Sequence, residues 1–149
     1  MKTQIRIVAG SLRGRKLTCT VNAHLRPTPQ RVREALFSIL GNAVPGRPFV
    51  DVFAGTGVVG LEALSRGARS VTFVERDFRL GADLERRPED LLSLVAGLQR
   101  KMAAGSVLVL QAERSPVLDE LPDRERWDQR RYGRNCLLVW GPSEGPRLT

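Results

Sequence analysis

Three glycines and one acid between residues 49 and 75 have the types and spacing that suit the binding of a nucleoside. Gly55, Gly57 and Gly60 follow the pattern G-x-G-x-x-G. Glycine at these positions permits a tight turn, lets the backbone approach a ligand and lets the next helix pack on its strand. Glu75 follows Gly55 by twenty positions, where an acid can accept hydrogen bonds from ribose hydroxyls. We therefore predict a nucleoside-cofactor site; the alternative is that the glycines serve only close packing.

A second acid, Asp51, indicates which class of nucleoside fits. It precedes Gly55 by four residues, in the order D-V-F-A-G-T-G. A carboxylate at this position can meet the cationic amino end of S-adenosylmethionine, whereas it would repel the pyrophosphate of a nicotinamide dinucleotide. The charge argument favours adenosylmethionine and leaves a nicotinamide-dependent oxidoreductase as the alternative.

These residues need a strand, a helix and a second strand to hold them. Residues 49–53 have the apolar composition of a strand buried on both faces of a parallel sheet. Residues 58–64 predict a helix that stops at Gly67, a residue suited to the left-handed conformation just past a helix end. Residues 71–74 predict the second strand. This order of elements indicates an α/β fold of the Rossmann type.

The composition limits the classes of protein that the 149 residues fit. Hydrophobic residues make up 42% of the chain and no apolar run approaches transmembrane length, so we expect a soluble protein with no membrane segment. No secretory signal is expected. Cys19 and Cys136 are isolated and His24 is the single histidine, which gives little support to a metal site or a histidine-dependent triad. We expect a cytoplasmic monomer.

The excess positive charge is concentrated near the N-terminus. Residues 1–47 hold nine Lys and Arg residues against one acid, whereas residues 48–149 hold fifteen residues of each sign. A basic segment beside a neutral remainder predicts a polyanionic partner. We therefore divide the chain into a basic, RNA-contacting extension, residues 1–47, and a Rossmann-like cofactor-binding domain, residues 48–149.

The extension is predicted to contain a basic hairpin and then a helix. Residues 5–9 and 17–21 are strand candidates on either side of a glycine-punctuated basic turn. In the helix, Thr28 suits the N-cap and Pro29 the first helical position. One buried apolar stripe follows: Val32, Leu36, Ile39 and Leu40. Since Arg31 and Arg33 lie off this stripe, we expect them outside the core.

The C-terminal half predicts a helix, a strand and a hairpin. A helical stripe in residues 91–102 begins after acids and ends at basic residues, as the helix dipole favours. Residues 107–110 predict a strand ending near Glu113, and residues 127–132 and 136–140 predict a hairpin. We interpret the aromatic residues of this hairpin as core residues rather than base-stacking platforms.

The order of motifs resembles that of the RsmD-like methyltransferases, bacterial enzymes that modify the exocyclic N2 of a guanine in 16S rRNA. The similar segments are RIVAGSLRGRKL, RPTPQRVREALFSIL, DVFAGTGVVGLEALSRGA, VTFVERD, and RRYG followed by LLVW. The combination of the second and third in this order is uncommon in other Rossmann-like enzymes. The resemblance implies a class I methyltransferase sheet with helices on both faces, S-adenosyl-L-methionine as cofactor, and 16S rRNA or the small ribosomal subunit as partner.

The resemblance and the charge distribution together give candidate site residues. The cofactor pocket is expected to be lined by Asp51, Phe53, Gly55, Thr56, Gly57 and Glu75. RNA contacts are expected from the basic hairpin and the helix that follows it: Arg6, Arg13, Arg15, Lys16, Arg26, Thr28, Arg31 and Arg33.

One motif of the family is missing. Amino-methylating relatives carry a tetrapeptide, Asp or Asn, Pro, Pro, Tyr or Phe, which holds the target amine and stacks on the base. No such tetrapeptide occurs in the 149 residues. The interval between Asp77 and Val107 is also too short for the expected strand, helix, strand unit, so we expect an internal deletion within residues 80–87. We assign no catalytic residue, Glu113 included, and a noncatalytic remnant that binds RNA or cofactor is the alternative function.

Overall fold

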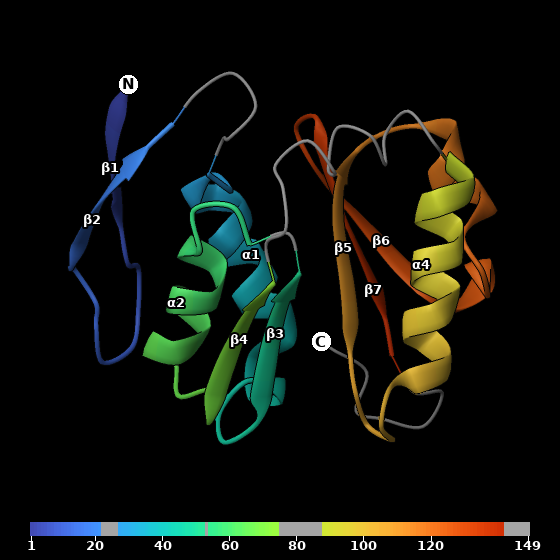
Figure 1. Cartoon of the computed structure of the whole chain (residues 1–149), viewed down its shortest axis with the longest axis horizontal. Helices are drawn as coiled ribbons and strands as arrows, with labels where there is room; N and C mark the ends of the chain where they lie inside the picture. Colours follow the sequence, from blue (N-terminus) through green and yellow to red (C-terminus); the bar gives the residue numbers. More distant parts are fainter. Residues whose placement is uncertain (22–26, 53, 75–87, 142–149) are drawn as a thin grey trace. The chain divides into compact units, whose positions relative to one another are not determined.

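The computed structural model describes residues 1–21, 27–52, 54–74 and 88–141 of the chain. These residues form an α/β structure with two two-stranded sheets and one three-stranded sheet. The chain separates into two compact units, Met1–Ala82 and Asp83–Arg147, and each is described by itself (Figure 1). The single sheet with helices on both faces stays a prediction.

The first unit begins with the predicted basic hairpin. Strands β1 (Lys2–Arg6) and β2 (Lys16–Thr20) pair antiparallel, with Ile5 opposite Leu17 and Arg6 opposite Lys16. The first strand lies three residues, and the second strand one residue, N-terminal to the bounds that the sequence predicted. Beyond the strands, a further backbone hydrogen bond joins the two sides of the hairpin: the Ile7 N–H donates to the Arg15 carbonyl at 2.9 Å.

Helix α1 (Gln30–Leu40) follows, and a short 3-10 helix, η1 (Gly41–Ala43), ends it. The predicted cap is wrong by one residue: Pro29, not Thr28, occupies the N-cap position, and no side chain caps the helix there. The buried side of α1 is also wider than the predicted stripe. It comprises Val32, Arg33, Leu36, Phe37, Ile39 and Leu40.

Strand β3 (Pro48–Val52), helix α2 (Val58–Ser65) and strand β4 (Ser70–Val74) complete the first unit. The two strands pair in parallel, with Asp51 beside Phe73. A Cβ atom on Gly60 would lie only 2.4 Å from the Phe73 ring, so the third glycine of the motif permits the close packing of α2 on β4. This confirms the packing role predicted from the spacing.

The prediction that the first strand is buried on both faces is wrong for the described residues. Val50 is 58% exposed and Val52 is 36% exposed. The ring of Phe49 stacks on Phe37 of α1, and Asp51 bonds to the backbone of α2. Because side chains alternate along a strand, both helices of this unit pack on the face of Phe49 and Asp51. Within the described residues of this unit, the valines of the opposite face are exposed.

The second unit packs one helix on an antiparallel sheet. Helix α4 (Pro88–Lys101) is followed by β5 (Leu108–Glu113), two 3-10 helices, η2 (Pro116–Glu120) and η3 (Arg124–Arg126), and strands β6 (Trp127–Tyr132) and β7 (Asn135–Trp140). The strand order is β5-β7-β6 (Figure 1). The helix, the strand and the terminal hairpin predicted from the sequence are therefore confirmed, and Trp127 and Trp140 are core residues as expected.

The hairpin, α1 and the glycine motif lie in one compact unit. The division into residues 1–47 and a cofactor-binding domain of residues 48–149 stays a prediction. Whether residues 1–47 act as an RNA-contacting extension stays a prediction. Within residues 1–21, 27–52, 54–74 and 88–141, no helix is long and apolar enough to cross a membrane. The same residues contain no cluster of His, Cys, Asp or Glu that could hold a metal ion.

Candidate functional site

The glycine motif forms a tight loop between β3 and α2. Gly55 and Gly57 have φ values of 54° and 74°, a left-handed conformation that L side chains rarely adopt. Gly57 is the N-cap of α2, and its N–H donates to the Ala54 carbonyl at 2.7 Å. The backbone requirement inferred from the spacing is therefore present, although these contacts do not test ligand binding.

Asp51 connects the strand to the helix that follows the loop. Its Oδ2 atom accepts a hydrogen bond of 3.0 Å from the N–H of Gly60. This contact fixes the carboxylate beside the loop, where one of its oxygens accepts the N–H of the helix. Asp51 is half-buried, as is Thr56, and Gly55 is exposed. The structure thus brings Asp51, Thr56 and the glycines together; Phe53 and Glu75 lie outside the described residues.

Most of the predicted RNA-contacting side chains are exposed. Arg6, Arg13, Arg15, Lys16 and Arg31 are exposed and Thr28 is half-buried. Arg26 lies outside the described residues. Two of the cations, Arg6 and Lys16, are directly opposite each other on the hairpin, so their charges are close together on one surface. That concentration of charge is suited to a polyanion.

Arg33 is not at the surface where the sequence analysis placed it. Its residue is 1% exposed, and its Nη2 atom donates to the carbonyl oxygen of Arg6 at 2.9 Å. Burial lowers the pKa of the Arg33 guanidinium, and the nearby carboxylate of Glu62 acts in the opposite direction. The prediction failed because the hairpin covers the side of α1 next to the apolar stripe, so Arg33 holds the hairpin instead of facing solvent.

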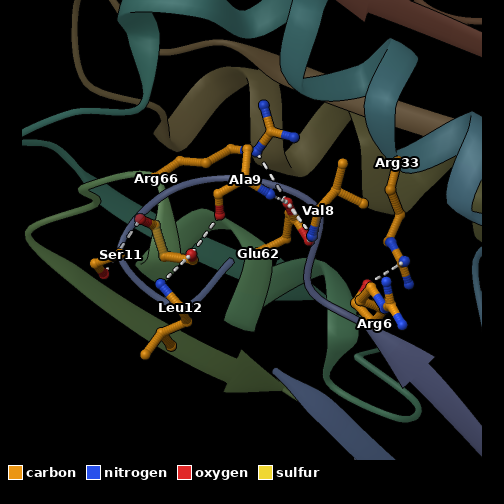
Figure 2. Close-up of polar contacts among 9 residues, drawn as sticks. Arg6, Val8, Ala9, Ser11, Leu12, Arg33, Glu62 and Arg66 are labelled. Carbon is orange, nitrogen blue, oxygen red and sulfur yellow. Dashed lines mark hydrogen bonds and ion pairs between the residues drawn. The ribbon is translucent and has the colours of Figure 1, made fainter. Parts of the chain in front are cut away.

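Glu62 and Ser65 of α2 hold the loop that follows β1, and the sequence analysis missed both. The carboxylate of Glu62, which is fully buried, accepts the N–H groups of Val8 and Ala9 at 3.1 to 3.2 Å. Ser65 Oγ accepts the Leu12 N–H at 3.0 Å and donates to the Ala9 carbonyl. These contacts converge on one side of α2 (Figure 2). A signal was present: an acid within an apolar helix needs a partner, and an arginine follows it by four residues.

That arginine, Arg66, completes the environment of Glu62. Its Nε atom donates to Glu62 Oε1 at 3.1 Å. The guanidinium also lies 4.8 Å from the centre of the Phe37 ring, a favourable cation–π distance. The buried carboxylate is therefore balanced by one cation and two backbone donors, as burial of a charge requires.

The chain is similar in sequence to proteins of one family. The family model described as "Conserved hypothetical protein 95" matches residues 5–92. "Ribosomal RNA small subunit methyltransferase D" of Escherichia coli is 40% identical over 113 residues, which are 76% of this chain and 56% of that protein. The protein of the same name from Haemophilus influenzae is 43% identical over 90 residues, 60% of this chain and 47% of that protein. The chain spans about half the length of the curated relatives it matches.

The backbone is similar to a solved structure as well. "Putative methyltransferase yhhF from Escherichia coli" superposes with a TM-score of 0.64 and 26% identity, covering 93% of this chain and 98% of that chain. The backbone similarity thus extends further than the sequence similarity to the curated relatives, and it supports an α/β fold of the methyltransferase kind.

Proposed function

Because this chain belongs to the family described as "Conserved hypothetical protein 95", we propose that it is an rRNA methyltransferase domain that uses S-adenosyl-L-methionine. The proposed target is the exocyclic N2 of a guanine in 16S rRNA, in free RNA or in the small ribosomal subunit. We further propose a Rossmann-like sheet with helices on both faces, a monomeric state and a cytoplasmic location.

One observation carries the proposal: in the segment of β3, the glycine loop, α2 and β4, a carboxylate lies beside a left-handed glycine turn. Asp51 is held there by the N–H of Gly60, and Gly55 and Gly57 keep side chains out of the turn. A fixed anion beside exposed backbone suits a ligand with a cationic amino end better than one with a pyrophosphate. Residues proposed to hold the cofactor are Asp51, Phe53, Gly55, Thr56, Gly57 and Glu75.

The rRNA part of the proposal rests on charge and on the names of the relatives. The exposed cations of the hairpin and α1 are placed as phosphate contacts would be, because Lys and Arg side chains at a surface neutralise a nucleic-acid backbone without reading its sequence. Residues proposed for this role are Arg6, Arg13, Arg15, Lys16, Arg26, Thr28 and Arg31. Residues 1–47 would then act as the RNA-contacting extension of the domain.

The cofactor, held by the residues of the glycine loop, would supply an electrophilic methyl group. The guanine amine would gain that methyl group as the sulfonium S–C bond breaks to leave S-adenosylhomocysteine, and the amine would release a proton to solvent. A guanine amine is a weak nucleophile because its lone pair is delocalised into the ring, so the rate depends on groups that position it and accept its hydrogen bonds. The tetrapeptide that does this in relatives is absent from the chain. We therefore propose slow transfer, and a segment deleted within residues 80–87 as its cause.

Transfer of tritiated methyl groups to small-subunit particles that lack the modification tests the proposal. A version with the deleted segment restored serves as the reference. We expect label at guanine N2 with both proteins, and faster turnover with the restored version. Label from the restored version alone would favour the alternative function, a noncatalytic remnant, which the missing tetrapeptide supports. No label from either protein would contradict the proposal.

A further inference from the structure

Helix α2 contacts two different parts of the first unit at its two ends. Its N-terminal end begins at the glycine loop, and its C-terminal end carries Glu62 and Ser65, which hold the loop of residues 8–12. The helix has eight residues, or about 12 Å at 1.5 Å per residue. The β1–β2 hairpin lies alongside this helix in Figure 1.

We infer that Glu62, Ser65 and Gly10 are positioning residues for RNA recognition. They fix the loop of residues 8–12 on α2, so that the cations that follow this loop in the sequence can contact the RNA backbone. The inference rests on the proposed function, because it requires that the hairpin contacts RNA. It concerns residues that hold the loop and do not themselves touch the RNA.

The carboxylate of Glu62 suits this task better than another acceptor would. Two successive backbone N–H groups, those of Val8 and Ala9, both point to it. An ionised carboxylate has two oxygens and about four acceptor positions, so it can satisfy both donors together with the Nε atom of Arg66. Without it, two N–H groups at the start of the loop would lose their partner, and the direction of the chain there would no longer be fixed.

Gly10 brings the loop into direct contact with the backbone of α2. Its φ is +84°, and a Cβ atom there would lie 1.9 Å from the carbonyl oxygen of Ser65. That same oxygen accepts the N–H of Ser11 at 2.8 Å. Even the uncharged methyl group of an alanine at position 10 would therefore have to move the loop away from the helix, and it would do so without changing any charge.

The loop of residues 8–12 is followed in the sequence by three exposed cations, Arg13, Arg15 and Lys16. Their backbone is fixed from both sides: the Arg13 N–H donates to the Gly10 carbonyl at 3.2 Å, and the Arg15 carbonyl accepts from Ile7 at 2.9 Å. Phosphates repeat along RNA, so cations on a loop of fixed shape can contact several of them at a lower cost in conformational entropy than cations on a flexible loop. Figure 2 shows the anchored side of this loop.

A double-mutant cycle on the full chain tests the inference. The charge-loss variant, Arg13→Ala, Arg15→Ala and Lys16→Ala together, is combined separately with Gly10→Ala and with Glu62→Gln. The measurement is filter binding of purified 16S rRNA over a series of KCl concentrations. The charge-loss variant is expected to lower the slope of log K against log salt by about 2 to 3 units, since each phosphate contact contributes somewhat under about one.

Gly10→Ala keeps every charge, yet we expect it to weaken RNA binding severalfold and to lower the salt slope by about one unit or more. In the charge-loss background, neither Gly10→Ala nor Glu62→Gln should weaken RNA binding further, because the contacts that they position are already absent. Calorimetry with S-adenosylhomocysteine serves as the control that the glycine loop remains folded. If Glu62→Gln lost this binding, the result with Gly10→Ala would decide, since that variant substitutes no residue of α2.

Two results would overturn the inference. Equal losses of affinity in both backgrounds would show that Gly10 and Glu62 act on general stability and not through the cations. A charge-loss variant with an unchanged salt slope would show that this loop is not the RNA surface, while leaving an rRNA methyltransferase possible. Absence of RNA binding by the unaltered chain would be a different failure, that of the proposed function itself.

Discussion

Gly60→Ala is expected to separate α2 from β4. The added Cβ would lie 2.4 Å from Cε1 of Phe73 and 2.8 Å from Cγ1 of Val71, so either the helix or both side chains must move. Overpacking of this kind costs about 1 to 3 kcal/mol. The exchange of glycine for alanine inside a helix by itself gains about 1 kcal/mol, which leaves a net loss of about 0 to 2 kcal/mol for this variant.

Gly97→Ala in α4 is the matched control. Gly97 is also inside a helix, but among the described residues a Cβ there would meet only the end of the Arg100 side chain, at 3.9 Å. It should therefore show the gain of about 1 kcal/mol without the overpacking cost. The two variants should differ by about 1 to 3 kcal/mol, which is the overpacking alone.

Hydrogen exchange at the amides of α2 and α4 is the suitable assay, because two compact units can open separately and a single unfolding transition need not report both. We expect protection of α2 to fall in Gly60→Ala and protection of α4 to rise in Gly97→Ala. Equal gains in protection would refute the reasoning, since they would mean that α2 does not press on β4 through Gly60.

Two further predictions concern charged residues. Asp51→Asn keeps an oxygen that can accept the Gly60 N–H but removes the charge. We therefore expect the affinity for S-adenosylmethionine to fall about tenfold, which is within the ~1 to 4 kcal/mol that a close charge pair supplies near a surface. Equal affinities in calorimetry would contradict the assigned role. Arg33→Met removes the side chain that donates to the Arg6 carbonyl, and it should lower the free energy of unfolding, measured by chemical denaturation, by about 1 to 3 kcal/mol. The exposed Arg31→Met should change it by about 0.5 kcal/mol or less. Similar effects at both positions would show that the contact of Arg33 does not stabilise the hairpin.

The features that the sequence predicted correctly depend on neighbouring residues. The glycine spacing predicts a left-handed turn because φ is a property of each residue and its adjacent atoms, and Gly55 and Gly57 have that conformation. The terminal hairpin was predicted because strand-forming residues surround a short turn. Tyr132 and Asn135, the strand residues on either side of that turn, are opposite each other. The family was also predicted correctly, because its motifs occur in the right order.

The features that were missed depend on how distant elements pack. Arg33 was placed outside the core because its neighbours along α1 gave an apolar stripe without it, but the hairpin, 27 residues away along the chain, covers it. Glu62 and Ser65 were missed for the same reason: their partners in the loop are 53 to 56 residues distant. No periodicity in α2 reports contacts with a segment so far away in the sequence.

The most direct test of the central claim is calorimetric titration of the chain with S-adenosylmethionine, S-adenosylhomocysteine and NAD. Gly57→Ala and Gly46→Ala are compared with the unaltered chain, because both glycines have φ values of 74°. Within the described part of the chain, an added Cβ at either position would meet no backbone atom within 4 Å. Of the two, Gly57 alone belongs to the proposed cofactor loop. We predict binding of both sulfur nucleosides, loss of that binding in Gly57→Ala and its retention in Gly46→Ala. Binding of NAD with neither sulfur nucleoside would contradict the account.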